Sequence, residues 1–251
     1  MKKVVRFLYS FWNWLAVFTV MFIACAFALV LGPFLGPKRL NPFLAWCMGI
    51  ALRATFCKLK VVVHPDFDKE RASIFCMNHV SVMDGHVASF SIPQPFTGLM
   101  LAWHFKIPAY GWIMKFTRGI PVYSKKSGRF AEVAAAARNR MEMGLGILTF
   151  PEGHRTTNGK TKPFRKGMFF LARDAGMPIV PLAAHGLADF NHKPQRTFSR
   201  VPITIFIGPQ ADTEGISDDE VSALTERTFR YVEYCVENGE FPPNDSALTS
   251  A

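Results

Sequence analysis

Hydrophobic positions divide this chain of 251 residues into two parts with different patterns. Residues 11–31 form an apolar run of about 21 residues without a charge, which is long enough to span a bilayer as a helix. Gly-Pro pairs at positions 32–33 and 36–37 break that helix, and a shorter apolar run follows at residues 42–52. We therefore expect a two-helix hydrophobic membrane motif over residues 1–57.

Beyond residue 57, short apolar runs typical of buried strands alternate with amphipathic runs typical of helices. We expect strands over residues 58–64, 73–77, 96–102, 146–150, 178–184 and 201–207. We expect helices over residues 82–90, 108–116, 129–143, 166–175 and 218–237, with Ser81 and Ser217 as N-caps. The alternation predicts an α/β domain over residues 58–251, in which a mixed sheet is covered by helices.

Positive charge is concentrated beside the apolar runs. The net charge is +10, and residues 1–65 supply eight of these charges because they contain no Asp or Glu. Basic residues that flank hydrophobic segments suit an anionic lipid surface, whereas a nucleic-acid-binding domain carries them on its folded part. We therefore expect a lipid bilayer, and no nucleic acid, as a partner. The expected location is the inner (cytoplasmic) membrane, with residues 58–251 facing the cytoplasm.

Three arrangements of the first apolar run compete. A cleaved signal peptide is disfavoured because a second apolar run follows directly and no clear cleavage site precedes a polar start. A single span would place the ends of the run on opposite sides of the membrane, whereas a helix pair dipping into one leaflet would keep them on the same side. Basic residues at both ends favour the one-leaflet arrangement, since both ends then face the same anionic surface.

A histidine and an aspartate five positions apart, His79 and Asp84, follow the strand expected at residues 73–77. Histidine can act as a general base near neutral pH, and a carboxylate bonded to one ring nitrogen fixes its tautomer. Ligand sites in open α/β sheets gather where a strand ends and a helix begins, so this pair is the candidate catalytic site. A chance pairing near a helix start is the alternative. Ser81 is expected to cap or pack, because no nucleophile elbow surrounds it.

The sequence favours no metal site. Its five cysteines form no CxxC pair, so we expect free buried thiols in a reducing compartment. A metal site made of His79, Asp84 and His86 is disfavoured, because residues two apart on a helix point in different directions.

A second polar stretch follows the strand expected at residues 146–150. Glu152, Gly153 and Arg155 lie in a turn there, and the planar guanidinium of arginine suits a phosphate. A solvated basic loop is the simpler alternative. The buried-type strand before the turn and the isolated acid favour a binding site. Further basic residues follow at Lys160, Lys162, Arg165 and Lys166, and a second candidate cationic patch comprises Arg118, Lys125 and Lys126.

Together, these motifs resemble those of the glycerolipid acyltransferase family, whose best-known members are 1-acylglycerol-3-phosphate acyltransferases of the PlsC type. The resemblance rests on Asn78-His79-x-Ser81-x-x-Asp84 and Phe150-Pro151-Glu152-Gly153-x-Arg155-Thr156, and it covers roughly residues 58–210. Residues 119–122, 164–167 and 177–182 match further family blocks. The chain departs from the family at His154, where Thr or Ser is usual, and at residues 123–126, where the second block usually continues with a bulky apolar residue, an acid and an arginine.

The resemblance implies an O-acyltransferase of phospholipid biosynthesis. It would move a fatty acyl group from acyl-CoA or acyl carrier protein to the free hydroxyl of lysophosphatidic acid, giving phosphatidic acid. His79, oriented by Asp84, would be the general base, without an acyl-enzyme intermediate. The expected substrate-binding residues are Asn78, Arg118, Glu152, Gly153 and Arg155. No cofactor is expected, because the acyl thioester is a co-substrate.

Three alternatives stay open at this stage. The departures at His154 and at residues 123–126 suggest an acyltransferase for another lysolipid acceptor, such as lyso-ornithine lipid or a lysophospholipid. A non-catalytic membrane lipid-binding protein would show no transfer to any acceptor. A lipid hydrolase would release the acyl group to water.

Overall fold

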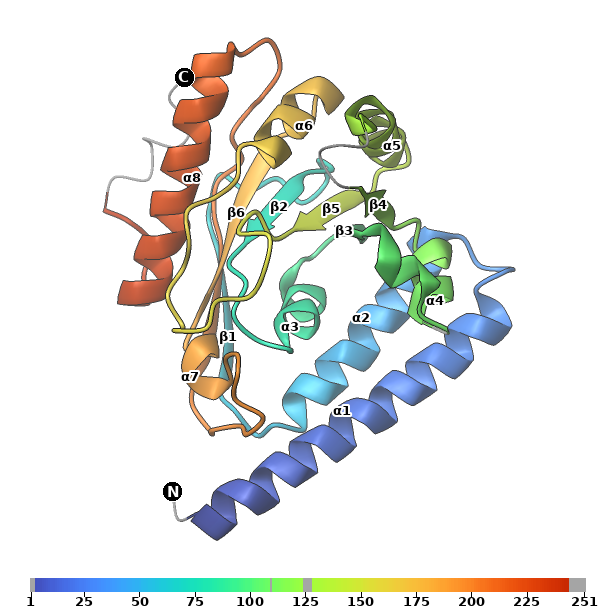
Figure 1. Cartoon of the computed structure of the whole chain (residues 1–251), viewed down its shortest axis with the longest axis vertical. Helices are drawn as coiled ribbons and strands as arrows, with labels where there is room; N and C mark the ends of the chain where they lie inside the picture. The colour runs from blue at the N-terminus through green and yellow to red at the C-terminus, as the bar shows by residue number, and fades with distance from the viewer. Residues whose placement is uncertain (1–2, 109, 124–127, 244–251) are drawn as a thin grey trace.

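The computed structural model describes residues 3–108, 110–123 and 128–243. Its centre is a seven-stranded sheet flanked by helices (Figure 1). The strands are β1 (Leu59–Val63), β2 (Ile74–Met77), β3 (Phe96–Leu101), β4 (Ile120–Val122), β5 (Gly146–Thr149), β6 (Ile179–His185) and β7 (Ile203–Ile207). The helices are α1 (Lys3–Leu31), α2 (Pro37–Arg53), α3 (Asp84–Ser91), the 3-10 helix η1 (Ala102–Lys106), α4 (Tyr110–Phe116), α5 (Phe130–Glu142), α6 (Gly167–Ala175), α7 (Leu187–Phe190) and α8 (Asp218–Asn238).

The strand order is β1-β7-β6-β2-β5-β3-β4. Neighbouring strands run parallel except β6 and β7, which pair antiparallel, so the sheet is mixed as predicted. β2 and β5 are direct neighbours, with Cys76 opposite Thr149. Because the two strands are parallel, the segments that follow their carboxyl ends emerge side by side.

Two hydrophobic layers cover the two faces of the sheet, and β2 shows how the pleat divides them. Ile74 and Cys76 join a core with side chains of α5, α6 and α8, whereas Phe75 and Met77 join a core with side chains of α1, α2 and α3. All four residues are fully buried. This explains why β2 is continuously apolar rather than alternating: helices cover both of its faces (Figure 1).

The N-terminal part forms two helices joined by a turn, as the pattern predicts. α1 buries a narrow stripe that repeats about every turn, made of Ser10, Asn13, Val17, Ala24 and Ala28, and leaves most of its large apolar side chains exposed. α2 starts at Pro37, earlier than the apolar run alone suggests. A proline in the first turn costs no hydrogen bond, because the N–H groups there have no helical partner.

Polar contacts attach the first third of α1 to the end of α2 and to the segment before β7 of the sheet domain. The indole Nε1 of Trp12 donates to the Ala54 carbonyl at 2.8 Å, and that of Trp14 donates to the Arg196 carbonyl at 2.9 Å. The Ser10 hydroxyl accepts from the Phe198 N–H at 2.9 Å. α2 lies between α1 and the domain (Figure 1). The helix pair therefore packs along the domain rather than projecting away from it.

The expected strands and longer helices are all present, and the differences are local. α3 starts at Asp84 instead of residue 82, and the residue before it is Met83, so Ser81 is not its N-cap. The Ser217 prediction is confirmed: its hydroxyl accepts from the Glu220 N–H, and the Glu220 carboxylate accepts from the Ser217 N–H, a reciprocal capping box. The short helices η1 and α7 carry too few residues for a periodic signal.

Candidate active site

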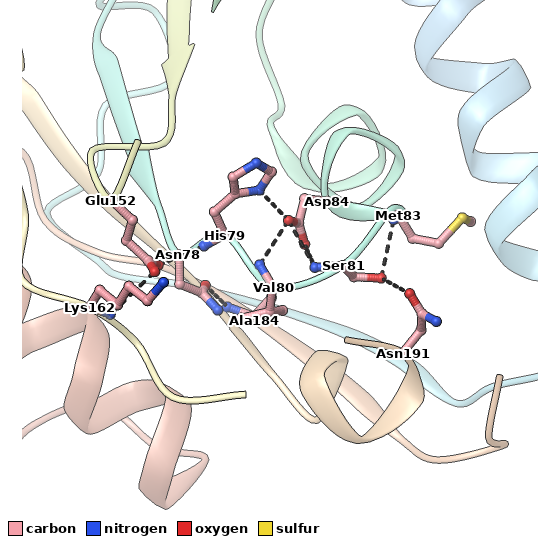
Figure 2. A network of polar contacts seen from close by, with 10 residues as sticks. All are labelled: Asn78, His79, Val80, Ser81, Met83, Asp84, Glu152, Lys162, Ala184 and Asn191. Atoms are coloured by element: carbon pink, nitrogen blue, oxygen red, sulfur yellow. Dashed lines mark hydrogen bonds and ion pairs between the residues drawn. The ribbon is translucent and has the colours of Figure 1, made fainter. Parts of the chain in front are cut away.

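His79 and Asp84 meet where β2 ends. The chain leaves β2 at Met77 and turns tightly before α3, which brings the His79 Nδ1 within 2.5 Å of the Asp84 Oδ2 (Figure 2). About a quarter of the His79 side chain is exposed, whereas Asp84 is buried. In Figure 2 the second ring nitrogen points away from Asp84. The pair therefore offers one free imidazole nitrogen at the surface and one that is held by a carboxylate.

The Asp84 carboxylate also organises the turn itself. It accepts the Val80 N–H at 2.9 Å and the Ser81 N–H at 3.0 Å. Burial raises the pKa of Asp84, and the bonds from His79, Ser81 and Val80 pull it back down. These hydrogen-bond donors favour the charged form of the Asp84 carboxylate. A carboxylate that orients a basic histidine needs that negative charge. One side chain thus fixes both the loop and the tautomer of His79.

Glu152 connects the two motifs. Its Oε1 accepts the His79 N–H at 2.7 Å, and its Oε2 accepts the Lys162 N–H at 3.2 Å (Figure 2). The side chain is buried, and burial raises its pKa to about 7. The Thr156 N–H in turn donates to the His79 carbonyl at 3.0 Å. Glu152 therefore holds the backbone of the loop that carries His79, and its predicted contact with substrate stays a prediction.

Gly153 and Arg155 lie in the turn after β5, beside His79. Gly153 has a φ of +82°, a conformation that favours glycine. A Cβ there would lie 2.7 Å from the Arg165 Cζ, so the missing side chain makes room for that guanidinium. The Arg165 N–H donates to the Pro151 carbonyl at 3.0 Å. The basic segment 160–166 thus returns to the turn and covers it.

Cationic side chains gather around this turn from two parts of the chain. His154 is exposed, and its pKa is lowered first by the charge of Lys162 and then by its own partial desolvation, with Arg165, Lys193 and His79 adding to the effect. Lys193 arrives from the connection between α7 and β7. The side chains of Arg155, Lys162, Arg165 and Lys193 form no ion pair with a carboxylate within the described part of the chain, although the charge of Lys162 lowers the pKa of Glu152. This cation cluster suits a multiply charged anion beside His79.

The structure does not bring every predicted residue to this place. Arg118 precedes β4, with a φ of +60°, and its carbonyl accepts the Arg140 Nε–H at 2.8 Å. β4 runs parallel to β3 and β3 to β5, so the amino end of β4 points away from the edge at which His79 lies. Lys125 and Lys126, predicted to join Arg118, lie outside the described residues.

Asn78 is fully buried, and its Oδ1 accepts the Ala184 N–H of β6 at 2.9 Å (Figure 2). This contact ties the ends of β2 and β6 together beside His79. Ser81 is also buried: its hydroxyl accepts the Met83 N–H and donates to the Asn191 Oδ1, each at 3.2 Å. A hydroxyl committed in this way packs the loop, as the sequence suggests.

Two contributors were not predicted as site residues. The Phe150 ring stacks on the His79 imidazole, with centroids 4.2 Å apart and planes 20° apart. Arg165 is visible in the sequence as one of several basic residues, but only the fold shows that its guanidinium packs on Gly153. The sequence signal for Arg165 is its position between the turn that follows β5 and the start of α6.

Fold and site together define an α/β protein with a hydrogen-bonded His-Asp pair at the carboxyl edge of the sheet, next to a turn surrounded by cationic side chains. The chain belongs to the acyltransferase family: the family model described as Acyltransferase matches residues 58–185, just over half of the chain.

Comparison with known proteins gives relatives named as 1-acyl-sn-glycerol-3-phosphate acyltransferases. The chain is 35% identical over 104 residues to the 1-acyl-sn-glycerol-3-phosphate acyltransferase alpha of Homo sapiens, a match that covers 41% of this chain and only 37% of that protein. It is 29% identical over 182 residues to the 1-acyl-sn-glycerol-3-phosphate acyltransferase of Borreliella burgdorferi, covering 71% of this chain and 72% of that protein.

Its fold is similar to that of the crystal structure of the 1-acyl-sn-glycerophosphate acyltransferase PlsC from Thermotoga maritima. The TM-score is 0.77 at 21% identity, and the match covers 94% of this chain and 97% of that one. The expected α/β fold with an N-terminal hydrophobic helix is therefore confirmed.

Proposed function

We propose that this chain transfers a fatty acyl group from an acyl thioester, acyl-CoA or acyl carrier protein, to the free hydroxyl of lysophosphatidic acid, giving phosphatidic acid. The observation that carries the proposal is the 2.5 Å contact between His79 Nδ1 and Asp84 Oδ2, which leaves the other ring nitrogen available beside a cluster of cations. The names of the relatives support the choice of acceptor.

In the proposed reaction, the free nitrogen of His79 takes the proton of the acceptor hydroxyl as its oxygen attacks the thioester carbonyl. The new C–O ester bond forms, the C–S bond breaks, and the thiolate takes the proton from the imidazolium as it leaves. Asp84 stabilises the imidazolium, and Asp84 and Glu152 hold the loop that aims it. General-base catalysis contributes about 10²–10⁴, so positioning of the two substrates supplies much of the remaining rate enhancement.

The cation cluster would hold the phosphate of the acceptor. Arg155 and Arg165 flank the Gly153 turn, and Lys162 lies next to the catalytic loop. A guanidinium offers two parallel N–H donors, which match two oxygens of a phosphate. Arg155 and Arg165 form no ion pair with a carboxylate in the described residues, so their charge is available for a ligand, whereas the charge of Lys162 also stabilises the Glu152 carboxylate.

Acceptor selectivity tests this function. Purified protein in detergent micelles receives labelled acyl-CoA with lysophosphatidic acid, lyso-ornithine lipid or monoacylglycerol. Transfer to lysophosphatidic acid is expected. Arg155→Ala and Arg165→Ala should each lower kcat/KM for that acceptor about tenfold or more, because a hydrogen bond to a charged group is worth about 1.5–3 kcal/mol.

Lys69→Ala is the matched control, because Lys69 is an exposed cation that precedes the amino end of β2, whereas His79 follows its carboxyl end. Transfer only to lyso-ornithine lipid would leave the proposed mechanism intact but show that lysophosphatidic acid is not the acceptor. Equal transfer to monoacylglycerol, unaffected by the arginine variants, would overturn phosphate recognition. Acyl release to water without an acceptor would indicate a hydrolase.

Membrane attachment belongs to the same proposal. α1 is the one helix among the described residues that is long and apolar enough to cross a membrane. Its first third is held to the domain through Trp12 and Trp14, so both ends of the helix stay near the domain. This favours the helix pair lying in one leaflet of the cytoplasmic membrane, with residues 58–251 on the cytoplasmic side and the catalytic edge open to lipid substrates.

A further inference from the structure

Large exposed apolar side chains are rare outside the N-terminal helices. Of the described residues beyond position 57, those that leave large apolar side chains exposed are Val63, Val82, Leu101, Trp103, Trp112 and Phe130. Four of these six lie in residues 101–130, and both tryptophans are about half exposed. Soluble proteins rarely expose two tryptophans so near to each other in sequence without a partner.

The same region repeats the charge pattern of the N-terminus. Residues 85–131 contain no Asp or Glu, but they contain Lys106, Lys115, Arg118, Lys125, Lys126 and Arg129. The only other long acid-free stretch is residues 1–65, which holds the hydrophobic helices. An apolar, aromatic and basic surface without acids is complementary to anionic lipid headgroups.

The fold joins the two acid-free stretches. Ile113 of α4 is buried in one cluster with Ala28 of α1 and Leu40 of α2, and a Cβ at Gly32 would lie 2.8 Å from the Phe116 ring. A Cβ at Gly111 would lie 2.3 Å from the Phe105 carbonyl oxygen, so η1 and α4 fold closely together. Figure 1 shows α4 beside the turn end of α1 and α2. η1 and α4, with Leu101 before them (residues 101–108 and 110–116), thus continue the surface of α1, and we call them the aromatic hairpin.

We propose that the aromatic hairpin is a second membrane-contacting element, with Trp103 and Trp112 at the headgroup level of an anionic bilayer and Lys106 and Lys115 facing lipid phosphates. Tryptophan favours this level because its ring is apolar and its N–H is polar. The proposal rests on the membrane attachment proposed above, but not on acyl transfer.

A second contact point would fix how the catalytic edge meets the membrane. The hairpin begins at the carboxyl end of β3, and β3 runs parallel to β5, which runs parallel to β2. The hairpin, His79 and Glu152 therefore emerge from the same edge of the sheet. If α1 alone contacted the bilayer, the whole molecule could still rotate about the axis of α1. Contact through both α1 and the aromatic hairpin would prevent this rotation and hold the catalytic edge at the bilayer.

Tryptophan quenching by brominated lipids tests the contact. The full chain is reconstituted in vesicles of phosphatidylcholine and phosphatidylglycerol with or without brominated acyl chains. The quenched amplitude is the difference in fluorescence between the two. In the variant Trp103→Phe/Trp112→Phe this amplitude should fall, because two of the five tryptophans no longer contribute. An unchanged amplitude would mean that both face water and would overturn the proposal.

Charge reversal gives an independent readout with a matched control. Lys106→Glu/Lys115→Glu should reduce quenching of the two tryptophans in vesicles that contain phosphatidylglycerol. Lys60→Glu/Lys69→Glu carries the same change in charge on exposed residues of the sheet domain and should leave the quenching unchanged. If the two double substitutions reduced the quenching equally, a specific role of the aromatic hairpin would be overturned. Wild-type protein whose tryptophans show no quenching would overturn membrane attachment itself, whatever its transferase activity.

Discussion

At the scale of single residues, the site depends on carboxylates that hold backbone rather than substrate. Asp84 accepts from His79 and from two backbone N–H groups, and Glu152 accepts the N–H of His79 and of Lys162. Each buried carboxylate loses water on folding, and the bonds it accepts offset part of that loss. His79 is therefore held in place through both its ring and its backbone.

The raised pKa of Glu152 predicts a pH-dependent stability. The folded state holds the Glu152 proton up to about pH 7, whereas the unfolded chain releases it near 4.5. Between these values the folded state binds more protons, so the free energy of unfolding falls as the pH rises, by up to on the order of 3 kcal/mol from this group. Thermal unfolding of Glu152→Gln from pH 5 to 8 should lack this fall. A difference from wild type that stays constant with pH would contradict the raised pKa.

At the scale of elements, the sequence predicts what depends on local pattern and misses what depends on contacts between distant segments. The strands after residue 58 follow from short apolar runs, and they are present. The N-cap at Ser217 follows from the acidic residues just after it, and it is present as a capping box. His79 and Asp84 were found because both lie within one turn. Lys193 was not found, and Arg165 was named only as one of several basic residues, because tertiary folding brings both to the Gly153 turn.

Arg118 is a predicted site residue that the fold places away from the His79 pair. Its neighbours in sequence match a family block, but strand direction decides where its side chain lies. It precedes β4, and β4 is parallel to β3, so Arg118 starts the strand at the edge away from His79. Sequence pattern alone does not fix the register of a three-residue edge strand.

The Gly153 turn predicts a substitution effect at this scale. In Gly153→Ala the left-handed φ of +82° costs about 1 kcal/mol or more, and the new Cβ would collide with the Arg165 guanidinium. We expect a raised KM for lysophosphatidic acid with a smaller change in kcat, measured by steady-state transfer. Gly167→Ala is the control, because a Cβ there meets no atom within 4 Å. Equal KM values for the two variants would contradict the coupling of Gly153 to Arg165.

At the scale of the whole molecule, the apolar exterior and the catalytic edge belong to one arrangement. α1 exposes most of its large apolar side chains while its polar contacts hold it to the domain. Both substrates of the proposed reaction carry acyl chains. A site that opens beside the membrane-bound helices would receive them without moving those chains through water.

Membrane topology tests this arrangement. In sealed inverted membrane vesicles, tags placed at the N-terminus and at the C-terminus should both be cleaved by added protease, because a helix pair in one leaflet keeps both ends on the cytoplasmic side. A fusion with a known periplasmic terminus is the control for vesicle integrity. Cleavage of the C-terminal tag with protection of the N-terminal tag would show that α1 spans the bilayer.

The central claim is that His79 acts as a general base for direct acyl transfer, and single-turnover transfer from labelled acyl-CoA to lysophosphatidic acid tests it most directly. His79→Ala should lower the rate by about 10²–10⁴ or more, with thermal stability and vesicle binding retained. Ser81→Ala, a change of the same loop, should keep most of the rate. Wild-type turnover in His79→Ala, or a labelled acyl-enzyme that disappears in Ser81→Ala, would contradict the mechanism.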